Sequence, residues 1–347
     1  MKITGFDFSD YTIKLKTPFL SSKGPIRERR GFLLTLNSSE YSAQGDIAPL
    51  PEFGSESPAT AERILRELKT SFPYLYKDCN EVSEIEFNLN NLTPFPALKH
   101  GLEQALLSLV AKKKKTDLKH LLEITSTEKV ILNAVVGLQN AEETVKMVRN
   151  YVDSGYKTIK LKAGRKSFDQ DLEIIEKVRL AVGHDIKIRL DVNGKWEIEE
   201  AVEKLNELAQ YDIQYVEQPV SLKQELSEIS KISPVPIAAD ESIRSVSDAF
   251  EFIENRLCPI LVLKPMMLGG ILDTLKIIDK ARRNNIITII SSSFESAIGK
   301  KALLFLASSI NNDYAHGIGT DEYYASPGSL SPDNGMITIN SPDYFLT

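Results

Sequence analysis

Residues 158–194 read TIKLKAGRKSFDQDLEIIEKVRLAVGHDIKIRLDVNG, a stretch that contains one complete structural unit. Two runs rich in β-branched residues, Thr158–Lys162 and Ile186–Val192, are predicted strands. Between them, apolar residues recur every three positions, which is the spacing of one helix face: Leu172, Ile175 and Val178. A strand, a helix and a second strand in this order predict a parallel β/α unit.

The same alternation continues on both sides of this unit. Six further strands are predicted at Val130–Val136, Tyr215–Glu217, Ile237–Asp240, Leu261–Lys264, Ile287–Ser291 and Tyr314–Gly317. From Lys162 to Ser291 the strand ends follow one another at intervals of 23 to 29 residues, close to the roughly 30 residues per unit of a β/α barrel. An open doubly wound sheet would carry a glycine-rich turn after its first strand, and the segment 137–139 (GLQ) is not one. The pattern therefore predicts a (β/α)7β TIM-like barrel.

The first part of the chain has a different pattern. Residues 1–98 contain two predicted strands and one predicted helix, at Tyr11–Leu15, Phe32–Leu36 and Thr60–Leu68. We expect an α+β capping domain here, a barrel over residues 99–320, and a final segment, about 321–347, that packs on the cap. The polar segment Ser21–Arg29 is typical of a mobile cover loop, and equally of an ordinary hairpin loop.

Composition limits the partners and the compartment. The net charge of -6 provides no wide basic field, and the one basic run, Lys112–Lys115, follows an apolar helical stretch and is interpreted as a solvated helix end, so no nucleic-acid partner is expected. Cys79 and Cys258 lie too far apart in the sequence for a disulfide framework or a thiolate metal site. No signal peptide or membrane span is evident, so we expect no membrane partner and a cytoplasmic location. The oligomeric state stays open.

Charged residues stand where the predicted barrel strands end. An ionised group in a strand that is buried on both faces costs several kcal/mol unless it is paired or binds a metal. Asp191, Glu217 and Asp240 end three consecutive strands, and the carboxyl ends of barrel strands share one rim. Ligation by oxygen alone is typical of Mg²⁺, with Mn²⁺ as the alternative, and no histidine has suitable spacing. The competing interpretation is a buried network of ion pairs.

Three lysines accompany these carboxylates. Lys160 and Lys162 alternate with Leu161, so both are predicted to point into the barrel, while Lys264 ends a strand on the other side. Two ammonium groups this close favour the neutral amine that a general base needs near pH 7. Lys162, nearer the rim, is the predicted base for removing a proton next to a carboxylate. The resulting enediolate would be stabilised by a divalent cation, and the predicted substrate is a small carboxylate.

At these motifs the chain resembles the enolase superfamily, in its muconate-lactonizing-type subgroup. The motifs are TIKLKAG (158–164), RLDVNGKW (189–196), YVEQPV (215–220), IAADES (237–242) and LKPMMLGG (263–270). Three more segments resemble the o-succinylbenzoate synthase family of that superfamily: GDIAPLPEFGSES (45–57), SSSFESAIG (291–299) and AHGIGT (315–320). The resemblance extends over nearly the whole chain, with Asp46 where relatives commonly have glutamate.

The resemblance implies the residue roles. Asp191, Glu217 and Asp240 would hold the metal, Lys162 would be the base assisted by Lys160, and Lys264 would stabilise the enediolate. Arg189, Ser291, Ser292, Ser293 and Gly317 are the expected substrate contacts, whereas Asn193 and Glu295 are expected to orient neighbouring groups, with Glu295 acting on Lys264 or on groups near it. The implied reaction is a syn-dehydration that yields an aromatic succinyl carboxylate in menaquinone biosynthesis.

Two rival functions remain at this stage. An N-succinylamino acid racemase or dipeptide epimerase would use Lys162 and Lys264 as two bases on opposite faces of one carbon. A binding protein without catalytic activity is the second rival, and the complete set of buried acids and lysines argues against it.

Overall fold

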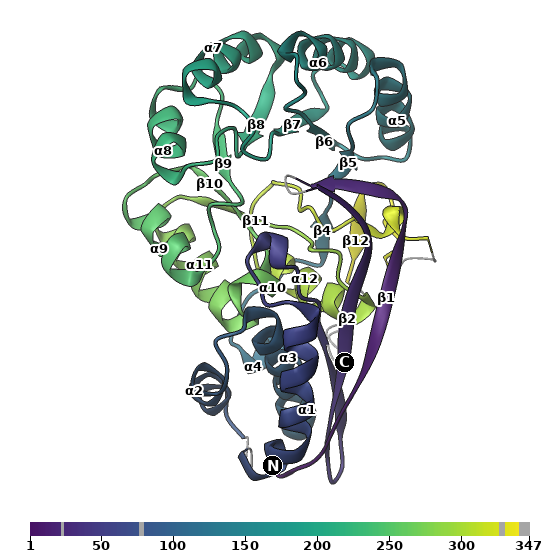
Figure 1. The fold of residues 1–347 in the computed structure, drawn as a ribbon, viewed down its shortest axis with the longest axis vertical. Helices are drawn as coiled ribbons and strands as arrows, with labels where there is room; N and C mark the ends of the chain where they lie inside the picture. The colour runs from purple at the N-terminus through teal and green to yellow at the C-terminus, as the bar shows by residue number, and fades with distance from the viewer. Residues whose placement is uncertain (22–23, 76–79, 326–329, 340–347) are drawn as a thin grey trace.

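The structure, a computed structural model, describes residues 1–21, 24–75, 80–325 and 330–339. Its first part is a cap built from a three-stranded antiparallel sheet with three helices beside it (Figure 1). The strands are β1 (Ile3–Ser21), β2 (Gly24–Ser38) and β3 (Ser42–Ile47), and the helices are α1 (Pro58–Leu75), α2 (Val82–Leu92) and α3 (Pro96–Lys114).

The cap sheet packs tightly against α3. Alternate residues of β2 are fully buried, as expected for a strand with one face on a core: Phe32, Leu34 and Leu36. Glycines allow the closest approach, because a Cβ built on Gly45 would lie 1.9 Å from the carbonyl oxygen of Gly101 in α3. The boundary expected between residues 98 and 99 therefore falls inside a helix that belongs to the cap core.

The predicted strands of the first part lie inside longer ones. Tyr11–Leu15 is the middle of β1 and Phe32–Leu36 the middle of β2, because the two strands form one long hairpin with Ser21 opposite Gly24. Of the segment Ser21–Arg29, residues 22–23 lie outside the described residues, and the positions from Gly24 onward belong to β2.

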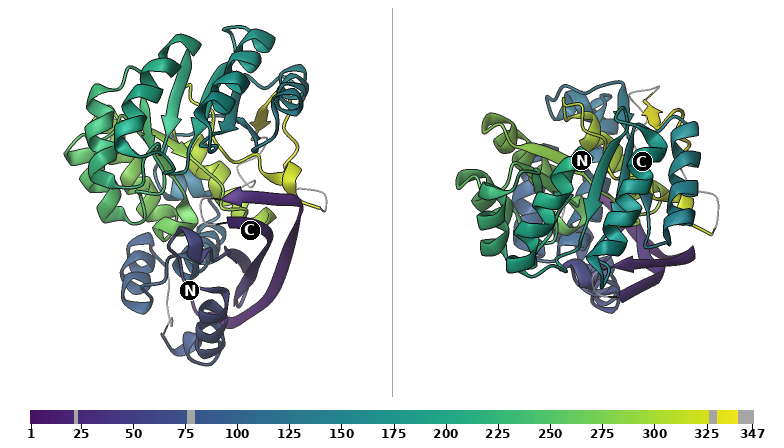
Figure 2. Two further views of the ribbon diagram at one scale, coloured as in Figure 1. Left: turned by 45° about the horizontal axis from the view of Figure 1, so that its top comes forward. Right: turned by 90° about the horizontal axis from the view of Figure 1, so that it is seen from above.

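The second part is a barrel of parallel strands with helices outside (Figure 2). Within the described residues the sheet order is β11-β10-β9-β8-β7-β6-β5. The strands are β5 (Ala134–Val136), β6 (Thr158–Lys162), β7 (Lys187–Asp191), β8 (Ile213–Glu217), β9 (Ile237–Ala239), β10 (Ile260–Leu263) and β11 (Ile287–Ile290). The helices are α4 (Leu118–Leu121), α5 (Ala141–Asp153), α6 (Phe168–Val182), α7 (Ile198–Leu208), α8 (Lys223–Ile232), α9 (Val246–Glu254), α10 (Pro265–Leu268), α11 (Ile271–Arg283) and α12 (Ala297–Ser308). The predicted TIM-like barrel with a cap is confirmed.

The barrel closes through a segment that forms only single bridges. His316 pairs with Leu132 and Gly317 pairs with Ser291, both in parallel, so the predicted strand Tyr314–Gly317 is too long. The predicted strand Val130–Val136 is also wrong as one element. Its first residues form β4 (Lys129–Ile131), which turns away to pair antiparallel with β12 (Met336–Thr338).

The last described residues run along both parts of the molecule. Tyr324 forms a bridge with Leu15 of β1, whereas β12 pairs with β4 of the barrel. Residues 340–347 lie outside the described part of the chain. The chain after the barrel therefore contacts the cap first and then returns to the barrel.

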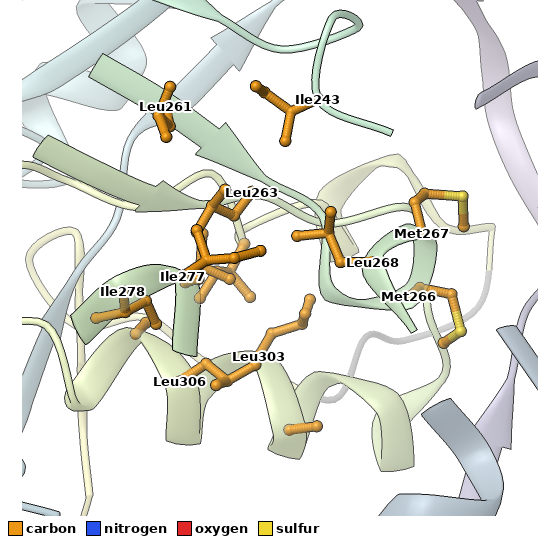
Figure 3. Close-up of a cluster of buried hydrophobic side chains, with 14 of the residues drawn as sticks. Ile243, Leu261, Leu263, Met266, Met267, Leu268, Ile277, Ile278, Leu303 and Leu306 are labelled. Carbon is orange, nitrogen blue, oxygen red and sulfur yellow. The ribbon is translucent and has the colours of Figure 1, made fainter. Parts of the chain in front are cut away.

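Apolar residues fill the space between the strands and the outer helices. Figure 3 shows one such cluster, in which β10, α10, α11 and α12 pack together. Its labelled members include Leu261, Leu263, Met266, Ile277 and Leu303. This packing fixes the position of the short helix α10 and, with it, the end of β10.

The lysine run 112–115 lies at the end of α3, as predicted, where positive charge interacts favourably with the helix dipole.

Among the helices of the described chain, none combines the length and the apolar character that crossing a membrane requires.

Candidate active site

The charged strand ends meet at one rim of the barrel. Lys162, Asp191 and Glu217 are neighbours across β6, β7 and β8, because the sheet register pairs Lys162 with Asp191 and Asp191 with Glu217. Asp240 directly follows β9 and Lys264 directly follows β10. All five residues are buried or nearly so, which places a dense set of charges in the barrel mouth.

Ion pairs connect the lysines to the carboxylates. The Lys160 ammonium lies 2.9 Å from Asp191 Oδ2 and 2.7 Å from Glu217 Oε1. Lys162 Nζ lies 2.7 Å from the same Asp191 oxygen, and Lys264 pairs with Asp240. The six residues that the sequence predicted to meet are therefore brought together.

The buried charges shift one another's pKa values. Burial raises the pKa of Asp191, but the charges of Lys160 and Lys162 outweigh it and lower the pKa below its usual range. Burial also dominates at Glu217, where it raises the pKa. For Lys160, burial lowers the pKa, yet Asp191 and Glu217 outweigh it and raise the pKa well above its ordinary value. The expected mutual weakening of the two ammonium groups is therefore wrong for Lys160, because carboxylates face it.

The carboxylates retain oxygens that suit a cation. Asp191 Oδ1 and Glu217 Oε2 are buried and accept no hydrogen bond, which is costly unless a positive group faces them. Among the described residues, no three acid, histidine or cysteine side chains are arranged closely enough to coordinate one metal ion. The other oxygens of Asp191 and Glu217 are paired with the Lys160 ammonium group. None of the four histidines lines the cavity. The donor set is oxygen only, which fits a hard divalent cation.

A cavity partly open to solvent is lined by these charges. Its floor contains Lys160, Lys162, Asp191, Asp240 and Lys264. The rest of the lining comes from the cap, from β5 and the loop after β7, from the turn after β11, and from the closing segment with the residues that follow it. The wall residues are Leu50, Phe53, Val135, Asn193, Ser291, Ser292, Ser293, Phe294, Gly317, Thr320 and Tyr323.

The serine turn after β11 is held by Glu295. The Ser292 hydroxyl donates to Glu295 Oε2 at 2.6 Å, and the Ser293 amide donates to the same carboxylate at 2.8 and 2.9 Å. Glu295 therefore orients nearby groups of the serine turn rather than Lys264, which is the second of the two roles expected for it. Ser292 is committed to this turn, whereas the buried Ser293 hydroxyl has no partner.

Asn193 connects two charged groups, as expected of an orienting residue. Its Oδ1 accepts from Lys162 Nζ at 2.7 Å, and its Nδ2 donates to Glu241 Oε1 at 2.9 Å. Glu241 was not among the predicted residues, although it directly follows Asp240 in the sequence. Lys162 thus has two fixed neighbours, Asn193 and Asp191.

Arg189 does not reach the cavity. It is fully buried one layer lower in the barrel, where Nε donates to Gln214 Oε1 at 2.7 Å and Nη1 donates to the Ala315 carbonyl at 2.7 Å. Its guanidinium lies 4.7 Å from the ring centroid of Tyr215. Arg189 is not among the lining residues of the cavity, and its contact with the substrate stays a prediction. Residues two apart in a strand share a face but not a height, so Arg189 lies below Asp191.

The cap supplies two lining residues that the sequence did not single out. Leu50 and Phe53 line the cavity, and the Phe53 ring belongs to the short helix η1 (Pro51–Phe53). Arg29 of β2 holds this wall in place, because Nη1 donates to the Pro49 carbonyl at 2.8 Å and Nε donates to the Ser293 carbonyl at 3.1 Å. Nothing in the sequence indicated that Arg29 is buried, because this residue stands among other basic residues.

Family models match both parts of the chain. The model described as "Enolase C-terminal domain-like" matches residues 143–342, and "MenC, N-terminal domain" matches residues 6–109. The o-succinylbenzoate synthase of Bacillus subtilis (strain 168) is 28% identical over 98% of this chain and 91% of that protein. Protein PHYLLO, chloroplastic, of Arabidopsis thaliana is 27% identical over 99% of this chain, which spans only 22% of that protein.

The barrel and cap are similar to solved structures. The dipeptide epimerase from Enterococcus faecalis V583, solved with Mg and the dipeptide L-Leu-L-Tyr, is 26% identical with a TM-score of 0.88 and covers 98% of both chains. Because the first family model covers more than half of the residues and the architecture agrees, this chain belongs to the enolase superfamily.

Proposed function

We propose that the protein is an o-succinylbenzoate synthase, which dehydrates 2-succinyl-6-hydroxy-2,4-cyclohexadiene-1-carboxylate to 2-succinylbenzoate in menaquinone biosynthesis. One observation carries the chemistry: amines from β6 and β10 flank a set of buried carboxylates that end β7, β8 and β9. The match of the cap to the MenC N-terminal domain supports this member of the superfamily, because cap residues line the cavity.

In this proposal Lys162 removes the proton next to the ring carboxylate. Asn193 Oδ1 and Asp191 Oδ2 hold Nζ at 2.7 Å each, so the amine is aimed at one position. The electron pair of the C–H bond becomes part of an enediolate, and the C–O bond to the ring hydroxyl then breaks. Because the elimination is syn, Lys162 returns its proton to the departing hydroxide as water, and the ring becomes aromatic.

Lys264 has an electrostatic role in this scheme. Its ammonium group comes from β10, which β7, β8 and β9 separate from β6 in the sheet, so it faces the reacting carbon from the other side. Asp191, Glu217 and Asp240 would hold Mg²⁺, with Mn²⁺ as the alternative. That ion would supply positive charge to the carboxylate oxygens on which negative charge develops.

The serine turn is the proposed site for the succinyl carboxylate. Ser291, Ser293 and Gly317 line the cavity, and the buried Ser293 hydroxyl is still without a partner. Ser292 would contribute by shaping the turn, because its hydroxyl already donates a hydrogen bond to Glu295. Leu50 and Phe53 of the cap would make the apolar contacts with the ring of the substrate.

A second candidate is an epimerase or racemase, which the similarity to a dipeptide epimerase favours. In that reaction Lys264 would give a proton to the face opposite Lys162. The test is a parallel assay of the purified protein with Mg²⁺. One arm follows formation of the aromatic product from the cyclohexadiene, and the other follows deuterium incorporation into dipeptides and N-succinylamino acids in heavy water. We expect dehydration. Isotope incorporation without dehydration would overturn the proposal in favour of the second candidate.

A further inference from the structure

Gln218 follows Glu217 directly and has an unusual backbone. Its φ is +42°, in the left-handed region that residues other than glycine seldom adopt. The residue is 1% exposed. A strained conformation persists only where the surrounding contacts impose it, and it is often found at functional sites.

The backbone of Gln218 joins the loops that carry the carboxylates. Its amide donates to the Ala238 carbonyl of β9 at 2.8 Å. Its carbonyl accepts from the Gly194 amide at 2.6 Å, in the loop that follows Asp191. One residue therefore connects the ends of β7, β8 and β9.

The side chain of Gln218 makes four more hydrogen bonds. Oε1 accepts from the backbone amides of Asp240 at 3.0 Å and Ser242 at 3.2 Å. Nε2 donates to the Val220 carbonyl at 2.9 Å and to Ser242 Oγ at 2.7 Å. Backbone amides can only donate and a carbonyl can only accept, so these partners fix the orientation of the side-chain amide. No donor or acceptor is left for a ligand.

The sheet alone does not fix Asp240. The last register pair between β8 and β9 is Glu217 with Ala238, and β9 ends at Ala239. The Asp240 amide therefore lies beyond the ladder and bonds to the Gln218 side chain instead. We infer that Gln218 is a positioning residue that sets the spacing of Asp240 from Glu217 and so prepares the carboxylates for a divalent cation. The inference rests on the proposed function for the identity of that cation.

The informative change is Gln218→Gly. Glycine adopts the left-handed conformation freely and keeps both backbone hydrogen bonds, so the fold is retained while the side chain is removed. We expect an unchanged circular dichroism spectrum and a lowered melting temperature, because backbone groups of Asp240, Ser242 and Val220 lose their hydrogen-bond partner. The Kd for Mg²⁺, measured by titration calorimetry without substrate, should rise about 10–100-fold, as is typical when a group that orients a metal ligand is lost.

A matched control is Asn285→Gly. Asn285 is exposed, has a φ of +58° and precedes β11 at the opposite end of the barrel. Its replacement makes the same kind of change away from the carboxylates, so Mg²⁺ should bind as in the wild type. A Kd that rises equally in this variant would overturn the inference.

A double-mutant cycle distinguishes positioning of Asp240 from a diffuse effect. In an Asp240→Ala background the ligand is already lost, so adding Gln218→Gly should weaken Mg²⁺ binding by less than about threefold. Full additivity of the two changes would contradict action through Asp240.

The outcomes separate this inference from the proposed function. If the wild type binds Mg²⁺ and Gln218→Gly binds it equally well, the positioning role is wrong and the proposed function stands. If the wild type binds neither Mg²⁺ nor Mn²⁺, both are wrong.

Discussion

The aromatic ring of Phe53, a cap residue, lies with its centroid 4.8 Å from the ammonium nitrogen of Lys264 in the barrel. The contact joins the two parts of the molecule beside Asp240, with which Lys264 is paired. The ring face attracts a cation by about 1–2 kcal/mol where water is partly excluded. The cap therefore supplies one neighbour of a lysine that the barrel positions.

This contact predicts the effect of Phe53→Ala. The variant loses both the cation–π contact and part of the apolar wall, so kcat/KM for dehydration should fall by about tenfold or more. The melting temperature should change little, because Phe53 is only partly buried. Phe87→Ala, which removes a ring that is 70% exposed on α2, is the control and should retain full activity. Equal activity of both variants would contradict a role for Phe53 in the site.

Lys162→Ala should lose most of the activity. Loss of a general base typically costs about 10²–10⁴-fold in kcat. Lys166→Ala changes an exposed lysine in the loop just after β6 and should have no effect. Stopped-flow or steady-state measurement of aromatic product formation checks both. Undiminished turnover of Lys162→Ala would refute its assignment as the base.

Metal removal should abolish activity reversibly. Without a cation, Asp191 Oδ1 and Glu217 Oε2 would face the negative substrate without compensation. Dialysis against a chelator followed by addition of Mg²⁺ should first remove and then restore dehydration. A chelator-treated sample with full activity and no detectable metal by mass spectrometry would contradict the scheme.

Arg29→Met should loosen the cap from the barrel. The guanidinium donates to the carbonyls of Ala48, Pro49 and Ser293, and each buried acceptor left unsatisfied costs about 1–3 kcal/mol. We expect a lower melting temperature, faster proteolysis and a raised KM. Arg27→Met, an exposed change two positions away on the same strand, should match the wild type in all three measurements.

Asp46 should make stability depend on pH. It is fully buried at the junction of cap and barrel, where it accepts from the Tyr11 hydroxyl at 2.7 Å and the Ser296 amide at 2.9 Å. Burial raises its pKa from 3.8 to about 6. Between these values the folded protein binds more protons than the unfolded chain, so stability decreases as the pH rises from about 4 to about 6.

The measurement for Asp46 compares unfolding of the wild type and Asp46→Asn across that pH range. The wild type should lose about 3 kcal/mol relative to the variant as the pH rises, because the variant has no carboxyl to ionise. Asp10→Asn, at an exposed position on β1, should give a profile parallel to the wild type. Parallel profiles for Asp46→Asn would show that burial does not raise this pKa.

The periodic part of the fold was predictable because its signals are local. The strand Thr158–Lys162 has the same bounds in the prediction and in the structure. The closing segment was harder, because His316 and Gly317 form single bridges whose partners, Leu132 and Ser291, are distant in sequence. The prediction of a single strand over Val130–Val136 was wrong for a similar reason, since its first residues pair with β12, which lies more than 200 positions later in the chain.

The candidate site was likewise predictable only in part. Asp191, Glu217 and Asp240 were predictable since the carboxyl ends of consecutive parallel strands share a rim. The depth of Arg189, the partner of Glu295 and the clamp made by Arg29 were not, because they depend on side-chain reach and on contacts between the two parts.

The residues that end the barrel strands can be found from local patterns alone, because strand periodicity and charge are both visible along the chain. The pairing of the charges, the serine hydroxyl that is left without a partner and the cap residues that line the cavity depend on the folded molecule. They are set by distances of a few ångströms between segments far apart in sequence, and no local pattern encodes such distances.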